Sequence, residues 1–210
     1  MRPRAVLFDL GGVLLDVHLD RTLAHWAAAA DPSGRLPADE LRGRLREDET
    51  YRAFECGHCD APDFFAALTK QLSITLDADS WRAGWLAMLG QVRPEMARLV
   101  EELAGEMPLF LFSNTNATHH AVWQQSCAPL LGHFRECFVS HQIGARKPDG
   151  AAFAAVVQRI GLPAADILFL DDLPANVAGA RATGLRAERV ASHSEAIAAL
   201  ACHGIPADRA

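Results

Sequence analysis

The sequence predicts an α/β protein: a doubly wound parallel sheet as the core, with a block of helices inserted after its first strand. Residues 5–8 form an apolar run of strand length, which needs cover on both faces, as in a parallel sheet. Residues 92–210 alternate strand-like runs with helical patterns, and residues 18–91 carry helical patterns alone. We therefore expect a core domain, residues 1–17 and 92–210, and a helical insert, residues 18–91.

The first strand ends at a carboxylate and a flexible turn. Asp9 directly follows the apolar run, and Gly11 and Gly12 come next. Glycine lets the backbone approach a ligand closely, and open α/β sheets bind ligands at the carboxyl ends of their strands. Asp9 is therefore a candidate nucleophile or metal ligand, although such a pattern alone also fits a cap on the next segment.

Helical spacing of apolar residues predicts the helices of the insert. Leu19, Leu23 and Trp26 fall on one face of a first helix, and Pro37 followed by acids favours the start of a second. Two more helices carry Phe64, Phe65 and Leu68, and Trp81, Trp85 and Met88. No strand is expected between residues 18 and 91.

Cys56 and Cys59 have the spacing of a redox dithiol. That motif follows a strand and opens a helix, whereas here the polar residues 47–52 precede the pair. No second ligand pair for zinc stands nearby in the sequence. We interpret both cysteines as loop residues, and the odd total of five cysteines favours reduced thiols.

The last stretch predicts four further strands and four helices. The strands are residues 107–112, 137–140, 167–170 and 186–190, and the helices are residues 95–103, 150–160, 176–183 and 195–200. Ser192 and Glu195 form a capping box at the start of the last helix. Because strand and helix alternate, we expect the strands to lie parallel in one sheet.

The composition makes several partners unsuitable. A formal net charge of −6 without a basic block argues against nucleic acid. No apolar run approaches the ~20 residues that a membrane span needs, and Asp9 interrupts the first apolar stretch too early for a signal peptide. We therefore expect a cytoplasmic protein without membrane contact; the composition does not predict its oligomeric state.

Two later strands end in residues that suit an anion. Ser113 and Asn114 follow residues 107–112 and offer a hydroxyl, an amide and backbone N–H groups, although this pattern alone also caps a helix. Lys147 comes just before the helix predicted at residues 150–160, where its charge would suit a phosphate group.

Asp171 and Asp172 directly follow the apolar residues 167–170. Two adjacent carboxylates repel each other and are costly to desolvate. A divalent cation accounts for the pair, and Mg²⁺ in particular prefers a few carboxylates together with waters and phosphate oxygens. Asp9 and Asp172, at the ends of neighbouring strands, would supply this set.

These clusters resemble, in order, the four motifs of the haloacid dehalogenase (HAD) superfamily, and they span nearly the whole chain. The matching residues are 8–13, 112–116, 146–148 and 169–172 with Asn176. The helical insert resembles the C1 cap of that superfamily. Within the superfamily, the sequence is most similar to bacterial α-D-glucose-1-phosphate phosphatases and their relatives, through residues 9–16, 20–26, 113–116 with Trp123, and 144–148.

The resemblance implies hydrolysis of a phosphate monoester through an aspartyl-phosphate on Asp9. It implies that Mg²⁺ binds Asp9, the carbonyl oxygen of Gly11 and Asp172, and that Asp171 and Asn176 orient Asp172. The substrate would be a small phosphorylated metabolite such as a sugar phosphate. Phosphoryl transfer asks a protein mainly for positioning and electrostatic stabilisation, which such a set provides.

The same resemblance assigns the phosphate-binding groups. Ser113 and the Asn114 amide would hold phosphate oxygens, and Lys147 would neutralise the charge of both the nucleophile and the phosphate. The cap would close over the site, exclude water and select the leaving group through its loops.

Gly11 departs from the pattern of most phosphatases in the superfamily. They carry a second aspartate at this position, two residues after the nucleophile, as a general acid and base. Losing a general acid typically costs ~10²–10⁴-fold in rate. Asp16 and His18, where the core meets the insert, are the nearest ionisable candidates for a substitute. The glucose-1-phosphate phosphatases share the glycine, and an anomeric oxygen is a better leaving group than a simple alcohol.

Two alternative functions stay open at this point. One is a metal-independent 2-haloacid dehalogenase, which also lacks the second aspartate and attacks carbon; the pair Asp171 and Asp172 argues against it. The other is a non-catalytic protein that binds a phosphorylated ligand, in which Gly11 marks lost chemistry. The joint presence of Asp9, Lys147 and Asp172 argues against that function.

Overall fold

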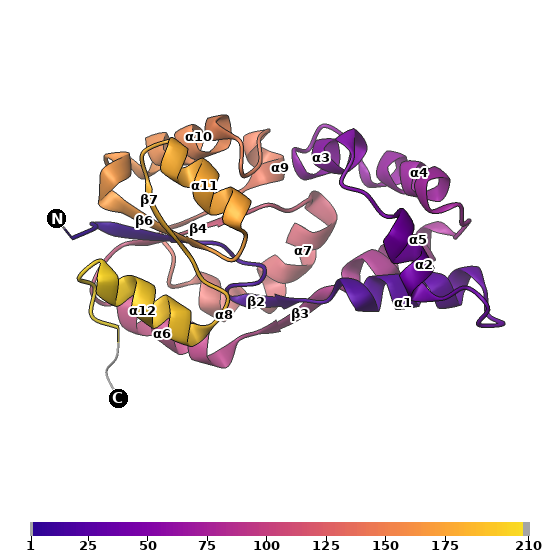
Figure 1. Cartoon of the computed structure of the whole chain (residues 1–210), viewed down its shortest axis with the longest axis horizontal. Helices are drawn as coiled ribbons and strands as arrows, with labels where there is room; N and C mark the ends of the chain where they lie inside the picture. Colours follow the sequence, from indigo (N-terminus) through magenta and orange to yellow (C-terminus); the bar gives the residue numbers. More distant parts are fainter. Residues whose placement is uncertain (1, 208–210) are drawn as a thin grey trace.

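Five parallel strands form the central sheet, in the order β5-β4-β1-β6-β7 (Figure 1). The computed structural model describes residues 2–207. The strands are β1 (Ala5–Phe8), β4 (Leu109–Ser113), β5 (Glu136–Val139), β6 (Ile167–Asp171) and β7 (Arg186–Arg189). The predicted fold class is therefore confirmed, and each predicted strand of the core is present within two residues of its expected bounds.

The register of the sheet aligns the ends of its three middle strands. Phe8 pairs with Leu111 of β4 and with Leu170 of β6. The next residue, Asp9, donates its backbone N–H to the carbonyl oxygen of Leu170 at 2.9 Å. Because the strands are parallel, the residues that follow β1, β4 and β6 emerge at one edge of the sheet.

Helices cover both faces of the sheet, as the apolar run of β1 requires. Val6 and Phe8 belong to a hydrophobic cluster with helices α6, α7, α8 and α12, and Ala5 and Leu7 to a second cluster with α10 and α11. Figure 1 shows these two layers above and below the strands. The helices are α6 (Pro94–Ala104), α7 (Ala117–Ser126), α8 (Ala128–Leu131), α9 (Ser140–Ile143), α10 (Gly150–Ile160), α11 (Pro174–Ala182) and α12 (His193–Cys202).

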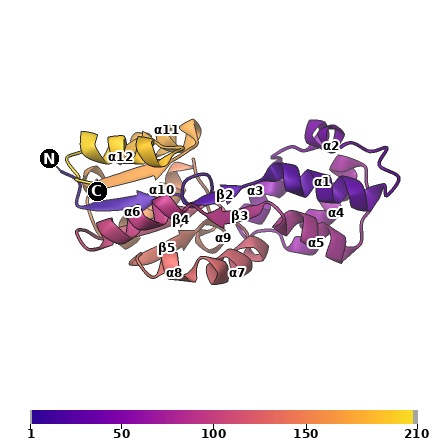
Figure 2. The same cartoon turned by 90° about the horizontal axis from the view of Figure 1, so that it is seen from below.

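Five helices lie beside the sheet and have a hydrophobic core of their own (Figures 1 and 2). They are α1 (Leu19–Ala30), α2 (Ala38–Arg44), α3 (Glu49–Glu55), α4 (Ala61–Leu72) and α5 (Ala78–Leu86). Trp26 and Trp85 stack at the centre of this core, with ring centroids 6.1 Å apart. Asp48, Asp60 and Asp77 accept backbone N–H groups as N-caps of α3, α4 and α5.

Two short strands join the sheet domain to these helices. β2 (Leu15–Val17) and β3 (Leu89–Val92) pair antiparallel, and Figure 2 shows them between the sheet and the helices. The expectation of helix alone between residues 18 and 91 is therefore wrong for the last residues of that interval. The two strands are short, are only partly buried and contain no sustained alternation, so only their mutual pairing identifies them.

The capping box before α12 is present. Ser192 Oγ accepts the N–H of Glu195 at 3.2 Å, and Glu195 Oε2 accepts the N–H of Ala191, one residue before the cap, at 2.8 Å. Across residues 2–207, none of the helices combines the length and the apolar character needed to span a membrane.

The turn that contains Cys56 and Cys59 follows α3 and contacts the core. Gly57 has a φ of +73°, and a Cβ at this position would collide with the carbonyl oxygen of His141. Burial raises the pKa of both thiols above the ordinary value, which disfavours the reactive thiolate. The glycine of the motif is therefore explained by the close approach of the turn after α3 to α9.

Candidate active site

A cleft of about 630 Å³ lies between the carboxyl edge of the sheet and the five helices. Its lining brings together most of the candidate residues from segments that are far apart in sequence: Asp9, Gly11, Asp16, His18, Ser113, Asn114, Lys147, Asp172 and Asn176. Asp171 does not line the cleft, because its side chain is completely buried beneath it.

Lys147 connects the nucleophile candidate to the buried aspartate. Its Nζ lies 2.7 Å from Asp9 Oδ1, 2.7 Å from Asp171 Oδ2 and 2.9 Å from the carbonyl oxygen of Phe112. These three acceptors use all three protons of an ammonium group. Burial lowers the pKa of Lys147, but the two carboxylates outweigh this effect and raise it overall. Lys147 therefore stays charged as the counterion of Asp9 and Asp171.

Asp9 is almost fully buried, and one of its two carboxylate oxygens is hydrogen-bonded within the protein. Oδ1 accepts hydrogen bonds from Lys147 Nζ and from the backbone N–H of Leu10, both at 2.7 Å. Among the described residues Oδ2 accepts none, so it is the atom available for attack or for a ligand. Burial raises the pKa of Asp9, Lys147 opposes the rise, and Asp171 and Asp172 add to it.

Asp9, Asp171 and Asp172 form a cluster that could hold a metal ion. Each offers an oxygen within 4.8 Å of the others. Asp171 is already occupied by Lys147, by the N–H of Leu173 at 2.9 Å and by Asn176 Nδ2 at 3.0 Å. Asp9 and Asp172 are therefore the two carboxylates with free capacity.

The charge and the donor atoms of this cluster fit a divalent cation. With one lysine against three carboxylates, the group carries a formal excess of two negative charges. Burial raises the pKa of Asp172 and Asp171 adds to the rise, and together they outweigh the opposing effects of Lys147 and Arg93. Oxygen ligands at the mouth of a cleft, with room for further oxygens, are what Mg²⁺ prefers.

Gly12 lets Asp172 come close to the β1 turn. Gly12 has a φ of +79°, and a Cβ there would collide with the carboxylate of Asp172. Gly11 faces a different neighbour, because a Cβ at residue 11 would lie 3.0 Å from Cγ2 of Val17. A valine methyl group therefore occupies the space into which a side chain at residue 11 would project.

Asn114 holds the backbone of Lys147. Its Nδ2 donates to the carbonyl oxygen of Lys147 and its Oδ1 accepts the N–H of Lys147, both at 2.9 Å. The side-chain amide is thus engaged with the protein, and any anion would meet the backbone N–H instead. Ser113 is buried beside it and makes only a long 3.4 Å hydrogen bond to the carbonyl oxygen of Asn114, which leaves its hydroxyl free to turn toward a ligand.

Asp16 and His18 both line the cleft but differ in their partners. Asp16 Oδ1 accepts from Arg93 Nε at 2.7 Å, and the same arginine donates to the carbonyl oxygens of Gly12 and Ala191. Asp16 and Arg93 therefore connect the turn after β1 to the end of β3. No side-chain hydrogen bond of His18 occurs within residues 2–207, so its ring is the less constrained of the two.

Two contacts between core and helices were not foreseen from the sequence. Arg146 Nε lies 2.9 Å from Oε2 of the buried Glu55, and Arg146 Nη2 lies 3.3 Å from Glu47. The ring of His119 stacks on Trp85 at 4.7 Å, and His119 Nε2 lies 2.8 Å from the carbonyl oxygen of Trp85. The partners are separated by 34 or more residues, so no local pattern signals them.

Burial dominates the titration of the groups at this junction. It raises the pKa of Glu55 to about 7, with Arg146 opposing the rise. It lowers the pKa of His119 to about 4, which keeps that imidazole neutral. The junction therefore holds one carboxyl group that titrates near neutral pH.

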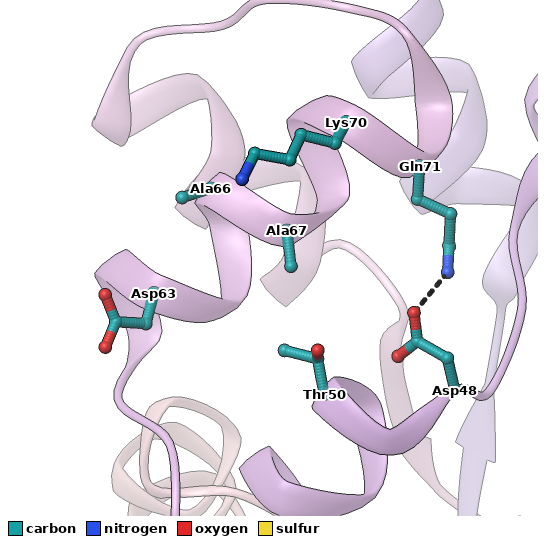
Figure 3. A pocket seen from close by; sticks show the side chains of 7 residues that line it. All are labelled: Asp48, Thr50, Asp63, Ala66, Ala67, Lys70 and Gln71. Atoms are coloured by element: carbon teal, nitrogen blue, oxygen red, sulfur yellow. Dashed lines mark hydrogen bonds between the residues drawn. The ribbon is translucent and has the colours of Figure 1, made fainter.

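A second hollow, of about 740 Å³, lies on the outer side of the helices between α3 and α4 (Figure 3). Its wall consists of Asp48, Thr50, Asp63, Ala66, Ala67, Lys70 and Gln71, and Gln71 donates to Asp48 across it at 2.9 Å. It contains none of the residues that line the active-site cleft, and an open hollow with Lys70 as its cation offers no arrangement for chemistry.

Comparison with curated proteins returns relatives with different substrates. A sesquiterpene phosphatase of Aspergillus oryzae is 28% identical over 186 residues, which cover 87% of each chain. A D-ribitol-5-phosphate phosphatase of Bacteroides thetaiotaomicron is 22% identical over 82% of this chain and 84% of its own. A drimenol cyclase of Aspergillus calidoustus is 28% identical over 87% of this chain, which spans only 33% of the cyclase.

Solved structures and a family model agree with the fold. A HAD-family enzyme of Bacteroides thetaiotaomicron, in complex with magnesium and inorganic phosphate, has a TM-score of 0.77 at 19% identity and covers 89% of this chain and 93% of its own. An L-2-haloacid dehalogenase of Xanthobacter autotrophicus has a TM-score of 0.66 at 20% identity, over 95% of this chain and 83% of its own. The model of haloacid dehalogenase-like hydrolases matches residues 3–184, and the chain therefore belongs to that family of hydrolases.

Proposed function

We propose that this hydrolase is a Mg²⁺-dependent phosphatase that cleaves a small phosphate monoester through an aspartyl-phosphate on Asp9. One observation carries the proposal. Asp9 lies on the cleft with one oxygen held by the buried Lys147 and the other free, next to Asp172, which also has free capacity. A carboxylate fixed in this way can attack phosphorus with little loss of orientational freedom.

The chain's own residues would manage the charge of the reaction. Lys147 favours the ionised form of Asp9 against the effect of burial and orients its carboxylate, and Asn114 fixes the backbone that carries Lys147. Because all three protons of Nζ are hydrogen-bonded, we infer that Lys147 mainly neutralises Asp9 and Asp171 and contributes less to binding the phosphate. Ser113 and backbone N–H groups at the end of β4 would bind the phosphate oxygens.

The metal would bind to Asp9, to Asp172 and to the carbonyl oxygen of Gly11. The formal excess of negative charge in the carboxylate cluster supports a divalent ion there. Asn176 holds Asp171, and Asp171 in turn fixes Lys147 and the N–H of Leu173 directly after Asp172. When bound, Mg²⁺ supplies positive charge that stabilises the phosphoryl group in the transition state.

A substitute for the general acid is proposed to be His18 rather than Asp16. Asp16 is committed to Arg93, whereas His18 lines the same cleft at the junction of core and helices. His18→Ala should lower kcat for substrates with poor leaving groups more than for p-nitrophenyl phosphate, whose leaving group needs no proton. Equal losses for both kinds of ester would remove this role from His18.

Helices α1–α5 are proposed to act as a cap of the C1 type. They contribute Tyr51, Glu55 and Trp85 to the cleft, and the loop between α2 and α3 adds Glu47. Arg146 lies beside the two glutamates from the core side. Closing such a cap would exclude water from the attack on phosphorus.

Two opposite kinds of phosphate ester, with a polar or an apolar leaving group, are candidates for the substrate. The resemblance to glucose-1-phosphate phosphatases favours a sugar 1-phosphate, whose anomeric oxygen leaves without strong acid assistance. The relatives act, by name, on a sesquiterpene and on ribitol 5-phosphate, so an apolar and a polar leaving group both occur among them.

Phosphate release from a panel of sugar phosphates, nucleotides, phosphoglycolate and p-nitrophenyl phosphate tests the proposal. We expect turnover with Mg²⁺, its loss in EDTA, and a decrease on the order of 10³-fold or more in Asp9→Asn. Chloride release from 2-chloropropionate in EDTA would favour the metal-independent dehalogenase instead. Absence of any turnover above the Asp9→Asn control would favour a non-catalytic phospholigand-binding protein.

A further inference from the structure

Two large apolar side chains are strongly exposed, and both belong to the active-site cleft. Val17 is 48% exposed and Leu173 is 52% exposed; within the described part of the chain no other large apolar side chain is as open to solvent. Val17 ends β2 beside Gly11, and Leu173 directly follows Asp172. A single exposed apolar residue is ordinary, but both occur at the mouth of one cleft, which is typical of a binding surface.

Two further side chains add carbon surface to the same cleft. Tyr51 of α3 and Leu89 of β3 line the same cleft and are only partly buried. Val17 and Leu89 also pair across the two short strands, so their side chains neighbour each other. An apolar wall therefore extends from the β1 turn toward the helices.

Several polar side chains of the cleft are already paired with one another. Arg93 is bound to Asp16 and to two carbonyl oxygens, and Arg146 donates to Glu47 and lies beside Glu55. Asn116 Oδ1 accepts the N–H of His119 at 3.0 Å and Nε1 of Trp85 at 3.4 Å. These side chains are thus occupied, and the polar groups left for the hydroxyl groups of a sugar or polyol are mainly the ring of His18, the hydroxyl of Tyr51 and the carboxylate of Glu47.

The paired polar side chains of the cleft favour an apolar leaving group over one rich in hydroxyl groups. A hydroxyl group that enters the cleft without a partner loses its hydrogen bonds to water, whereas a methylene group gains from burial. From this contrast we propose that the substrate is a phosphate monoester of an alcohol that is apolar next to the phosphoester oxygen, carrying a hydrocarbon chain or ring. The proposal rests on the phosphatase function above and departs from the sugar phosphate expected from the resemblance.

Matched pairs of esters test this preference. Cyclohexyl phosphate and an inositol monophosphate share a six-membered ring and differ in hydroxyl groups; ethyl, butyl and hexyl phosphate differ only in length. We expect kcat/KM to rise along the alkyl series by up to about fourfold per buried methylene group. Cyclohexyl phosphate should exceed inositol monophosphate by about tenfold or more, as for one or more unpaired hydroxyl groups.

Two variants connect the preference to the apolar wall. Val17→Ser and Leu173→Ser should each lower the ratio of kcat/KM for hexyl phosphate over ethyl phosphate. Val157→Ser, a partly buried valine of α10 outside the cleft, is the control and should leave that ratio unchanged.

Different results would overturn the apolar substrate preference and the phosphatase function. Inositol or hexose phosphates that match or exceed the apolar esters would overturn this inference alone and leave the phosphatase intact. A flat alkyl series, or a length preference that survives both serine variants, would do the same. Failure of every ester, including p-nitrophenyl phosphate, to exceed Asp9→Asn would overturn the phosphatase function and this inference with it.

Discussion

Replacing Lys147 by methionine removes the ammonium group that lies 2.7 Å from both Asp9 and Asp171. Methionine has similar length and suits a buried site, so the loss of charge dominates the effect. Removing one partner of a buried ion pair costs about 3–5 kcal/mol, because the other partner stays buried without compensation. Here two carboxylates lose their partner, so we expect a loss in the free energy of unfolding at the upper end of that range.

Urea unfolding at pH 8 and at pH 5 measures this loss and its cause. Burial already raises the pKa of Asp9, and without Lys147 its carboxyl group binds a proton still more readily in the folded state. A group that holds more protons in the folded than in the unfolded state destabilises the fold as pH rises. The penalty of Lys147→Met should therefore be larger at pH 8 than at pH 5.

A second substitution separates charge from packing. Adding Asp9→Asn to Lys147→Met removes one uncompensated carboxylate, so the double variant should recover about 1–3 kcal/mol relative to Lys147→Met alone. Lys70→Met, at an exposed lysine of α4, is the control and should change stability by less than about 0.5 kcal/mol. A loss in Lys147→Met as small as that of the control, or one that is equal at both pH values, would refute the proposed role of the ammonium group.

Three further substitutions test the metal site and the junction. Gly12→Ala and Gly161→Ala both place a side chain at positive φ, which should cost roughly 1–2 kcal/mol of stability at Gly161 and more at Gly12, where the Cβ would also collide with the carboxylate of Asp172. Because of that collision, only Gly12→Ala should weaken Mg²⁺ binding in a calorimetric titration. Gly57→Ala should increase proteolysis at the junction of core and helices, whereas Gly34→Ala, with open space around its Cβ position, should not. Relative to Glu55→Gln, the wild type should lose about 3 kcal/mol of stability as pH rises from 4.5 to 7, because Glu55 keeps its carboxyl proton up to about pH 7 only in the folded state. A stability difference that stays constant with pH would contradict the raised pKa of Glu55.

The core of the fold was predictable because its signals are local. Residues 5–8 of β1 and residues 167–170 of β6 are continuous apolar runs that are buried, and each run is followed by a carboxylate. In a parallel sheet such strand ends meet at one edge, so Asp9, Asp172 and Ser113 were grouped correctly without knowledge of any contact.

The short strands β2 and β3 were missed for the opposite reason. Each has three or four residues with mixed burial, and each exists because the other is present, more than 70 residues away in the chain. The placement of Asp171 also depends on distant partners. Its carboxylate holds Lys147, 24 residues earlier, which the residue pattern assigned to the phosphate and the family resemblance to the phosphate and the nucleophile.

The same distinction explains why the polarity of the cleft cannot be read from its residue types. Arg93 and Arg146 line the cleft and, by composition, would suit a substrate rich in hydroxyl groups or charge. Their ion pairs with Asp16 and Glu55 reach across 77 and 91 residues and leave them little capacity for a ligand. What stays exposed at the mouth is the carbon surface of Val17 and Leu173. The chemistry at phosphorus thus follows from local motifs, whereas the choice of leaving group follows from which distant polar groups satisfy one another.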